Sequence, residues 1–215
     1  MQRVMRTWIL VSLLFAGCSA SLEDGAEPTP MSMRERLASE TRLLMVAPES
    51  GGVITAERWT HDGWQAGIVD LHVDTGELVA AADEAGAITV ARFGLGLQPI
   101  DLPESLFERP ARMVNVRVDL GESVRSREVT WAGDDAATAK LELGLTMSWA
   151  LDIGGGPQPL GMPELPPVPV TLELTGDGTV VHGALRGNAP GELWSWADLV
   201  KLHDLTLVLA AQTVR

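Results

Sequence analysis

The sequence predicts an all-β protein of antiparallel strands, and three observations support this class. From Gly52 onward, apolar and polar residues alternate with a period of two, as in strands that bury one face. Short segments rich in glycine and aspartate separate the alternating runs, and such short links join antiparallel neighbours. One run, from Thr138 to Ile153, is far longer than the usual strand of about 5 to 6 residues. We therefore expect an antiparallel β-sandwich or a curved half-barrel with long amphipathic strands.

A helix is expected before the sheet. Ser32 and Glu35 have the spacing of a capping box, and apolar residues recur at helical spacing as far as Val46. We expect this helix to pack on the domain. The predicted strands are residues 53–59, 65–74, 77–82, 87–97, 113–120, 127–131, 138–153, 168–175, 179–185 and 205–214, with hairpin connections at 75–76, 83–86, 133–135 and 176–178.

Two later segments depart from the strand pattern. Residues 154–169 contain several prolines, which lack the N–H groups that an interior strand donates, so a long crossover loop is expected. Residues 192–201 are expected to form a short helix before the last strand. Its tryptophans, Trp194 and Trp196, would cap the core. Alternatively, they would lie at a membrane interface, where an indole ring finds both apolar and wet surroundings.

The longest alternating run has one apolar face and one polar or small face. Its 13 residues from 141 to 153 would span about 43 Å at strand rise, so the strand must either bend, with Gly144 as the candidate position, or belong to an elongated sheet. The interior would then be filled by side chains, or it would leave an apolar groove for an acyl chain. The face that would contact such a ligand carries Leu141, Leu143, Leu145, Met147, Trp149 and Leu151.

The N-terminus has the order of a secretory signal. Arg3 and Arg6 precede an apolar run of about ten residues, half of the about 20 that a helix needs to cross a bilayer. Leu14-Phe15-Ala16-Gly17-Cys18 follows, and Cys18 is the one cysteine of the chain.

These residues resemble the lipobox of bacterial lipoproteins. The resemblance covers the first 18 residues and implies a diacylglycerol on the Cys18 sulfur, cleavage before Cys18 and acylation of its new amine. It divides the chain into a signal peptide (1–17), a lipidated acidic tether (18–30) and one β-rich domain (31–215). By the same resemblance, Ser19, which is not aspartate, permits transfer to an outer membrane.

The charge of the chain excludes one class of partner. The formal net charge is -13, and a surface of this sign repels phosphate backbones. Nucleic acid is therefore not expected as a partner.

The sequence offers little for catalysis or metal binding. Asp70, His72 and Asp74 would project from one strand face and could hold a divalent ion, although a solvated face shows the same spacing. The chain lacks the G-x-S-x-G motif of serine hydrolases, and acylation would remove its one thiol. We therefore expect a protein that is not an enzyme and has no cofactor.

Three functions follow from these expectations. The first is an envelope-anchored lipoprotein that binds a lipid, another apolar ligand or an envelope component through its sheet. The second is a structural or adaptor lipoprotein with a filled core that acts by surface contacts. The third is a metal-dependent hydrolase that uses Asp70, His72 and Asp74.

The lipid anchor gives a direct prediction. Changing Cys18 to serine should release the protein from the membrane fraction. The acyl chains anchor the protein because each CH₂ group buried in the bilayer contributes about 0.8 kcal/mol to the free energy of binding. Fractionation and incorporation of labelled palmitate measure this. A variant that stayed with the membrane, or a wild-type chain without label, would show that Cys18 is not the anchor.

Overall fold

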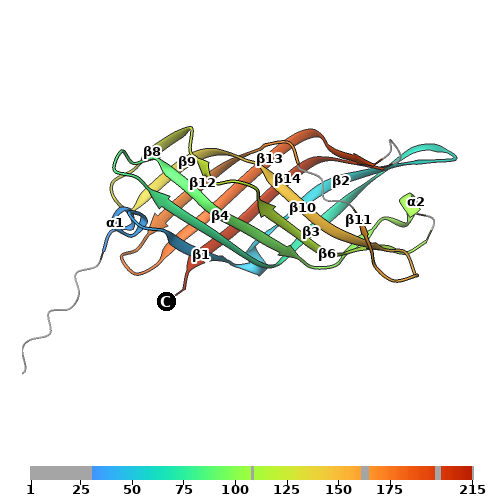
Figure 1. Cartoon of the computed structure of the whole chain (residues 1–215), viewed down its shortest axis with the longest axis horizontal. Coiled ribbons are helices and arrows are strands. Elements are labelled where there is room, and N and C mark those ends of the chain that lie inside the picture. The colour runs from blue at the N-terminus through green and yellow to red at the C-terminus, as the bar shows by residue number, and fades with distance from the viewer. Residues whose placement is uncertain (1–30, 108, 161–164, 197–199, 215) are drawn as a thin grey trace, which may run out of the picture.

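The computed structural model is an elongated, mostly antiparallel β structure with a short helix at each end (Figure 1). It describes residues 31–107, 109–160, 165–196 and 200–214. The predicted signal peptide, Cys18 and the tether lie outside the described residues. The antiparallel β class predicted from the alternation is confirmed.

The helices are α1 (Met33–Leu37) and α2 (Glu104–Phe107), and η1 (Ala47–Glu49) is a 3-10 turn. The strands are β1 (Thr41–Met45), β2 (Gly51–Thr60), β3 (Gly63–Ala82), β4 (Ile88–Leu97), β5 (Ile100–Leu102), β6 (Ala111–Leu120), β7 (Val124–Arg125), β8 (Glu128–Trp131), β9 (Ala136–Leu143), β10 (Leu145–Asp152), β11 (Gln158–Leu160), β12 (Val168–Gly176), β13 (Val181–Trp196) and β14 (Val200–Thr213).

The sheet closes on itself through the segment 136–152. Its first half, β9, pairs with β12, and its second half, β10, pairs with β6. The remaining pairs lead from β6 through β4 and β3 to β14, β13 and β12. Since β9 and β10 are consecutive, with only Gly144 between them, the ladder returns to its starting segment. The change of pairing partner occurs at Gly144, the residue named as the candidate position for a bend, and the apolar alternation continues across it.

β1 and β2 share one position in the ring. Both pair antiparallel with β3 on one side and with β14 on the other, one after the other along the axis. Ser50 joins them, because its hydroxyl accepts from the Ala210 N–H at 3.0 Å and donates to the Ala210 carbonyl at 3.1 Å. This hydroxyl replaces backbone partners where the strand is interrupted.

The predicted hairpin turn at residues 75–76 is wrong, because β3 runs unbroken through it. A Cβ on Gly76 would lie 2.6 Å from the Met45 Cγ and 2.8 Å from a Leu95 methyl group. The glycine is therefore explained by close packing with the strands on either side, and not by a turn.

The predicted helix over residues 32–46 is correct only in its first turn. The capping box between Ser32 and Glu35 is present, but α1 ends at Leu37. Residues 41–45 form β1 instead, and Leu43 is fully buried there. As a strand, residues 41–45 pair with backbone groups of β3 and β14, which would have no partners there if these residues were helical.

The predicted helix over residues 192–201 is also wrong where the chain is described. Residues 192–196 continue β13, and residues 200 and 201 begin β14. Residues 197–199 lie outside the described part. The predicted crossover loop at 154–169 holds one short strand, β11, at the edge of the sheet, where Pro159 interrupts no interior ladder.

The interior is a single apolar cluster drawn from residues between Met33 and Ala211. At one end α1 closes the ring, because Met33 and Leu37 are fully buried and Asp135 accepts from the Met33 N–H at 2.9 Å. α2 lies at the opposite end (Figure 1). All the described core residues belong to the predicted domain, so a chain that begins at residue 31 contains the whole core.

Gly76 and Gly144 give a matched test of the packing between strands. Gly76→Ala should lower the free energy of unfolding by about 1–3 kcal/mol, the usual cost of overpacking. Gly144→Ala should leave it unchanged or raise it by up to about 1 kcal/mol, since a Cβ there meets nothing within 4 Å. Urea unfolding measures both. Equal effects of the two changes would contradict the packing role of Gly76.

Candidate functional site

Two cavities adjoin inside the end of the ring that carries α2. One is an enclosed void of about 50 Å³ with an entirely apolar lining that includes Leu145 and Met147. The other, the mouth pocket, has a volume of about 570 Å³ and opens to solvent. Three side chains line both cavities and form the floor of the mouth pocket: Leu102, Met113 and Leu202.

The mouth pocket has an aromatic wall with a few charged groups. The wall is formed by Trp59, Phe107, Trp149 and Trp194 together with aliphatic side chains. Its charged side chains are Glu57, Arg58 and Arg109.

Two of the indole rings contact each other inside the pocket. The ring centroids of Trp149 and Trp194 are 5.2 Å apart, and the planes meet at 80°. This edge-to-face arrangement is the one that aromatic pairs prefer. Trp149 comes from β10 and Trp194 from β13, so the contact joins two separate segments of the ring.

Irregular strand pairing lies beside both indoles, and it turns Trp194 inward, whereas Trp149 faces inward by the regular alternation of β10. The register of β10 against β6 shifts between Ser148 and Ala150, and opposite this shift Asn115 has a φ of 55°. The result is that Trp149 and Ala150, which are consecutive, are both buried. Bulges commonly redirect side chains in this way next to functional sites.

Two register shifts in β13 position Trp194. The register of β13 against β14 shifts between Ala189 and Glu192 and again between Glu192 and Trp194. Leu193 therefore lines the enclosed void while Trp194 lines the mouth pocket. Asp204, with a φ of 53°, holds this region together by accepting from the Gly191 N–H at 2.8 Å.

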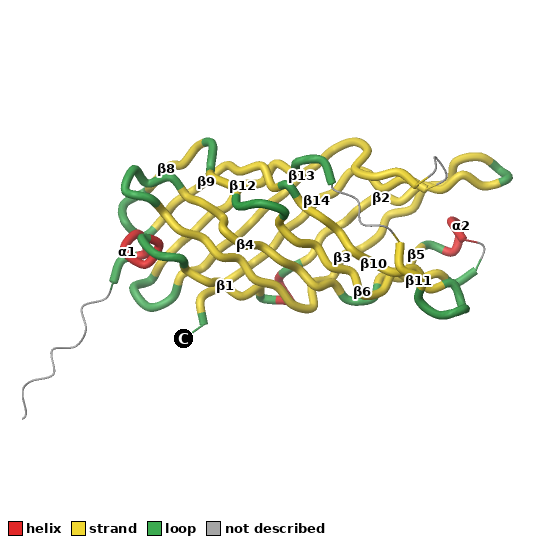
Figure 2. The backbone as a smooth tube through the Cα atoms, in the orientation of Figure 1, coloured by secondary structure: helices red, strands yellow, loops and turns green. Residues whose placement is uncertain are grey.

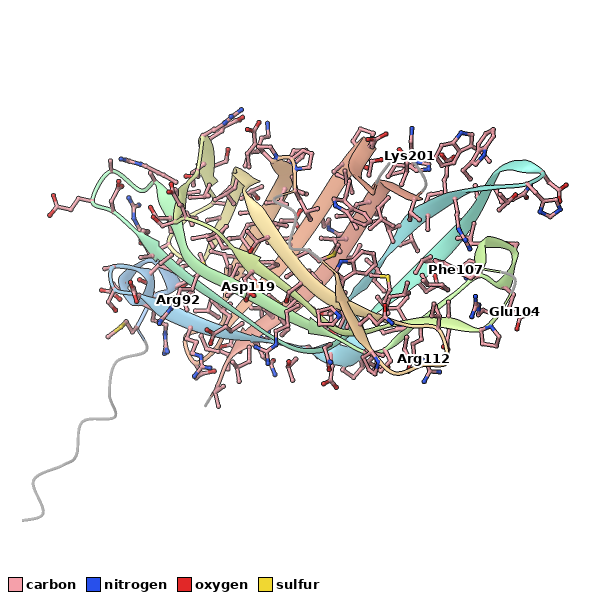
Figure 3. All side chains as sticks on the ribbon, turned by 45° about the vertical axis from the view of Figure 1, so that its right-hand side comes forward. Arg92, Glu104, Phe107, Arg112, Asp119 and Lys201 are labelled. Atoms are coloured by element: carbon pink, nitrogen blue, oxygen red, sulfur yellow. The ribbon has the colours of Figure 1, made fainter. Side chains whose placement is uncertain are left out.

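Arg58 links the pocket to α2. Its guanidinium donates to the Leu106 carbonyl at 2.6 Å and lies 4.9 Å from the centre of the Phe107 ring. Figure 3 shows Phe107 at this end of the molecule, together with Lys201 from β14. Arg58 thus holds α2 against the rim of the pocket.

The Trp149 indole has a polar atom without a partner. Its side chain is 7% exposed, and its Nε1 has no hydrogen-bond acceptor among the described residues. Leaving a buried donor unpaired costs about 1–3 kcal/mol. An acceptor oxygen supplied by a ligand would recover that cost.

The six residues predicted as an apolar ligand face divide among three surroundings. Leu141 and Leu143 are buried in the core toward the α1 end. Leu145 and Met147 line the enclosed void, and Trp149 and Leu151 line the mouth pocket. The run therefore leads from the closed end to the open end of the interior, and its last part reaches the mouth pocket.

The predicted metal ligands lie elsewhere. Asp70, His72 and Asp74 share the outer face of β3 and are exposed, as the alternation predicts. Within the described ranges, no group of three or more histidine, cysteine, aspartate or glutamate side chains could hold a metal ion. The metal-dependent hydrolase therefore has no structural support.

The outer face of the sheet carries charged pairs. Arg42 pairs with Glu77 at 2.7 Å, and Lys140 pairs with Glu128 at 2.8 Å. A lysine or arginine on a strand face in hydrocarbon costs about 2–4 kcal/mol at the bilayer midplane. These faces are therefore suited to water.

Comparison with known proteins places the chain in no family. No protein-family model matches it, and no curated protein matches it. Among solved structures, it is similar to Ail, the attachment invasion locus protein of Yersinia pestis, in complex with the heparin analogue sucrose octasulfate. The identity is 10% and the TM-score is 0.38, over 81% of this chain and 99% of that chain. A likeness this distant gives no guide to function.

Among the described residues, no helix is long and apolar enough to cross a membrane.

The bulge at Asp204 gives a pH prediction. The Gly191 N–H, and then His203, lower the pKa of Asp204. A depressed pKa stabilises the fold above the unfolded value of about 3.9, and this contribution is lost as the pH falls through the lower folded pKa. Asp204→Ala should therefore be less stable than wild type at pH 7, and the difference should shrink toward about pH 2.

Urea unfolding of both proteins across this pH range measures the difference. A deficit that is the same at both ends of the range would show that the carboxylate charge does not stabilise the bulge.

Proposed function

We propose that this protein is an envelope-anchored bacterial lipoprotein, not an enzyme, that binds a lipid or another small apolar ligand in the mouth pocket. The observation that carries the proposal is the open, aromatic pocket whose floor adjoins an entirely apolar interior. Its volume of about 570 Å³ falls within the range of about 300–1,000 Å³ that small-molecule sites have.

The polar groups of the pocket favour a ligand with an apolar body and at least one oxygen. Arg109 at the rim has no hydrogen bond or ion pair with the described residues, and the Trp149 N–H lacks an acceptor. Few polar groups in a mainly apolar wall are typical of sites that orient a ligand. The apolar body would lie against the indoles, with its end directed toward the floor.

The anchor is supported by the N-terminal residues alone. The basic and apolar segment that ends at Cys18 fits a lipoprotein signal, and Ser19 favours the outer membrane. The charged pairs Arg42–Glu77 and Lys140–Glu128 on the outer face support an attachment through acyl chains, without a sheet that spans the hydrocarbon.

One observation favours the adaptor function as the second candidate. The enclosed void is only about 50 Å³, so side chains fill most of the interior. If the mouth pocket also stays empty in the native protein, surface contacts are the function that remains.

Ligand binding is tested on a chain that begins at residue 31, purified without detergent. Native mass spectrometry should show a bound lipid mass, and the chain should bind N-phenylnaphthylamine, a fluorescent apolar probe. Trp194→Ala should weaken probe binding by about tenfold, which corresponds to about 1.4 kcal/mol, because it removes one wall of the pocket.

Trp131→Ala is the matched control. Trp131 lies at the α1 end, where its indole donates to the Gly86 carbonyl at 2.8 Å and stacks with Arg34. The Trp131→Ala variant should bind the probe with an affinity within about twofold of wild type. Bare protein in the mass spectrum, together with no probe binding, would reject the ligand-binding function in favour of the adaptor.

A further inference from the structure

Most of the exposed large apolar side chains gather on one outer surface. Among the described residues seven such side chains are exposed, and five of them lie on β2, β3 and β14. We call these five the apolar strip: Val53, Trp59, Trp64, Ile68 and Val208. Scattered apolar side chains are normal on a surface, but a contiguous patch marks an interaction site.

The strand register brings the members of the apolar strip onto one face of neighbouring strands. Trp59 is paired with Trp64, and their rings meet edge to face at 5.7 Å. Ile68 is paired with Thr55, two residues from Val53, so the two apolar side chains are diagonal neighbours. Ala66 lies between Trp64 and Ile68 on the same face, with Glu57 opposite it, and Asp70 lies opposite Val53.

The two tryptophans stand at the tip of a projecting hairpin. Figure 2 shows the β2–β3 hairpin extending beyond the other strands, at the end of the molecule that carries α2. Trp59 and Trp64 are 51% and 40% exposed there, and Lys201 Nζ lies 4.9 Å from the centre of the Trp64 ring. Indole rings with an adjacent lysine are typical of the region where a membrane meets water.

We propose that the apolar strip and the hairpin tip dock on a lipid bilayer, with the mouth pocket opening at the bilayer surface. Trp59 belongs to both surfaces, since it lines the mouth pocket and is also exposed on the hairpin. A lipid that leaves the bilayer at the strip would therefore meet the pocket without crossing water. This docking goes beyond ligand binding, and it can fail while ligand binding holds.

The chain outside the structure favours the bilayer over other occupants. The 13 residues of the predicted tether (18–30) span at most about 45 Å when extended, so an acylated Cys18 keeps the bilayer near the domain at a high effective concentration. The tether joins the domain at the α1 end, and the hairpin is at the other end (Figure 1). The strip lies along β2, in the half of the ring toward the hairpin, while β1 occupies the half toward α1, so the domain would lie on its side with the β2 half on the bilayer.

Charge also limits the mode of docking. Glu57 and Asp70 are on the same outer face as the strip, and Lys201 lies over the Trp64 ring. Such a surface gains little from anionic head groups, so binding should come from apolar burial. Binding to vesicles of phosphatidylcholine should accordingly persist at high salt, which screens charged contacts.

The experiment uses flotation with phosphatidylcholine vesicles and the chain that begins at residue 31, which lacks the anchor. Ile68→Asp is the test variant, because Ile68 is 73% exposed and does not line the mouth pocket. Val214→Asp is the matched control, because Val214 is 69% exposed near the C-terminus, at the α1 end. Both variants add one negative charge.

Ile68→Asp should lower the vesicle partition coefficient at least tenfold, and Val214→Asp should leave it within twofold. Both variants should bind N-phenylnaphthylamine as wild type does, which separates docking from ligand binding. Equal loss in both variants, or no vesicle binding by wild type, would overturn the docking proposal. So would a wild-type dimer that Ile68→Asp dissociates, because the strip would then bind a second copy of the chain.

Discussion

The fold depends on one segment that takes two different partners. Residues 136–152 pair with β12 along β9 and with β6 along β10. Without this change of partner the sheet would be an open ladder with two unpaired edges, and such edges invite association with other chains. Leu143 and Leu145, on either side of Gly144, are both almost completely buried, so the segment changes partners while its apolar face stays on the core.

The open end owes its character to irregularities in otherwise regular strands. The shifts in β13 turn the Trp194 ring inward next to the buried Leu193, where strict alternation would face it outward, and Trp149 follows the alternation of β10. The two rings then meet and form one wall of the pocket. Asn115 and Asp204 adopt positive φ values opposite the register shifts in β10 and β13, a backbone conformation in which asparagine and aspartate are less costly than most residues. The two positive φ values thus occur at the end of the ring that holds the mouth pocket.

Alternation in the sequence was sufficient to predict most of the long strands and the inward face from Leu141 to Leu151, but it missed β1, the short strands β5, β7 and β11, and the second half of β13. Alternation gave wrong predictions where the conformation of a residue depends on contacts with segments distant in sequence. Gly76 looks like a turn residue in the sequence, but it makes room for Met45 and Leu95, which are distant in sequence. Residues 41–45 have helical spacing and yet form a strand, because β3 and β14 offer partners on both sides. Neither the bulges nor the mouth pocket could be predicted, since a bulge is defined by the register of two strands.

The closure of one end by α1 constrains how a bound ligand would enter and leave the protein. Met33 and Leu37 seal that end, so the interior is a blind-ended compartment and cannot serve as a conduit. Entry and departure must use the same opening. Delivery to a second location would then require the whole domain to turn or to travel, and the length of the tether would set how far it can go.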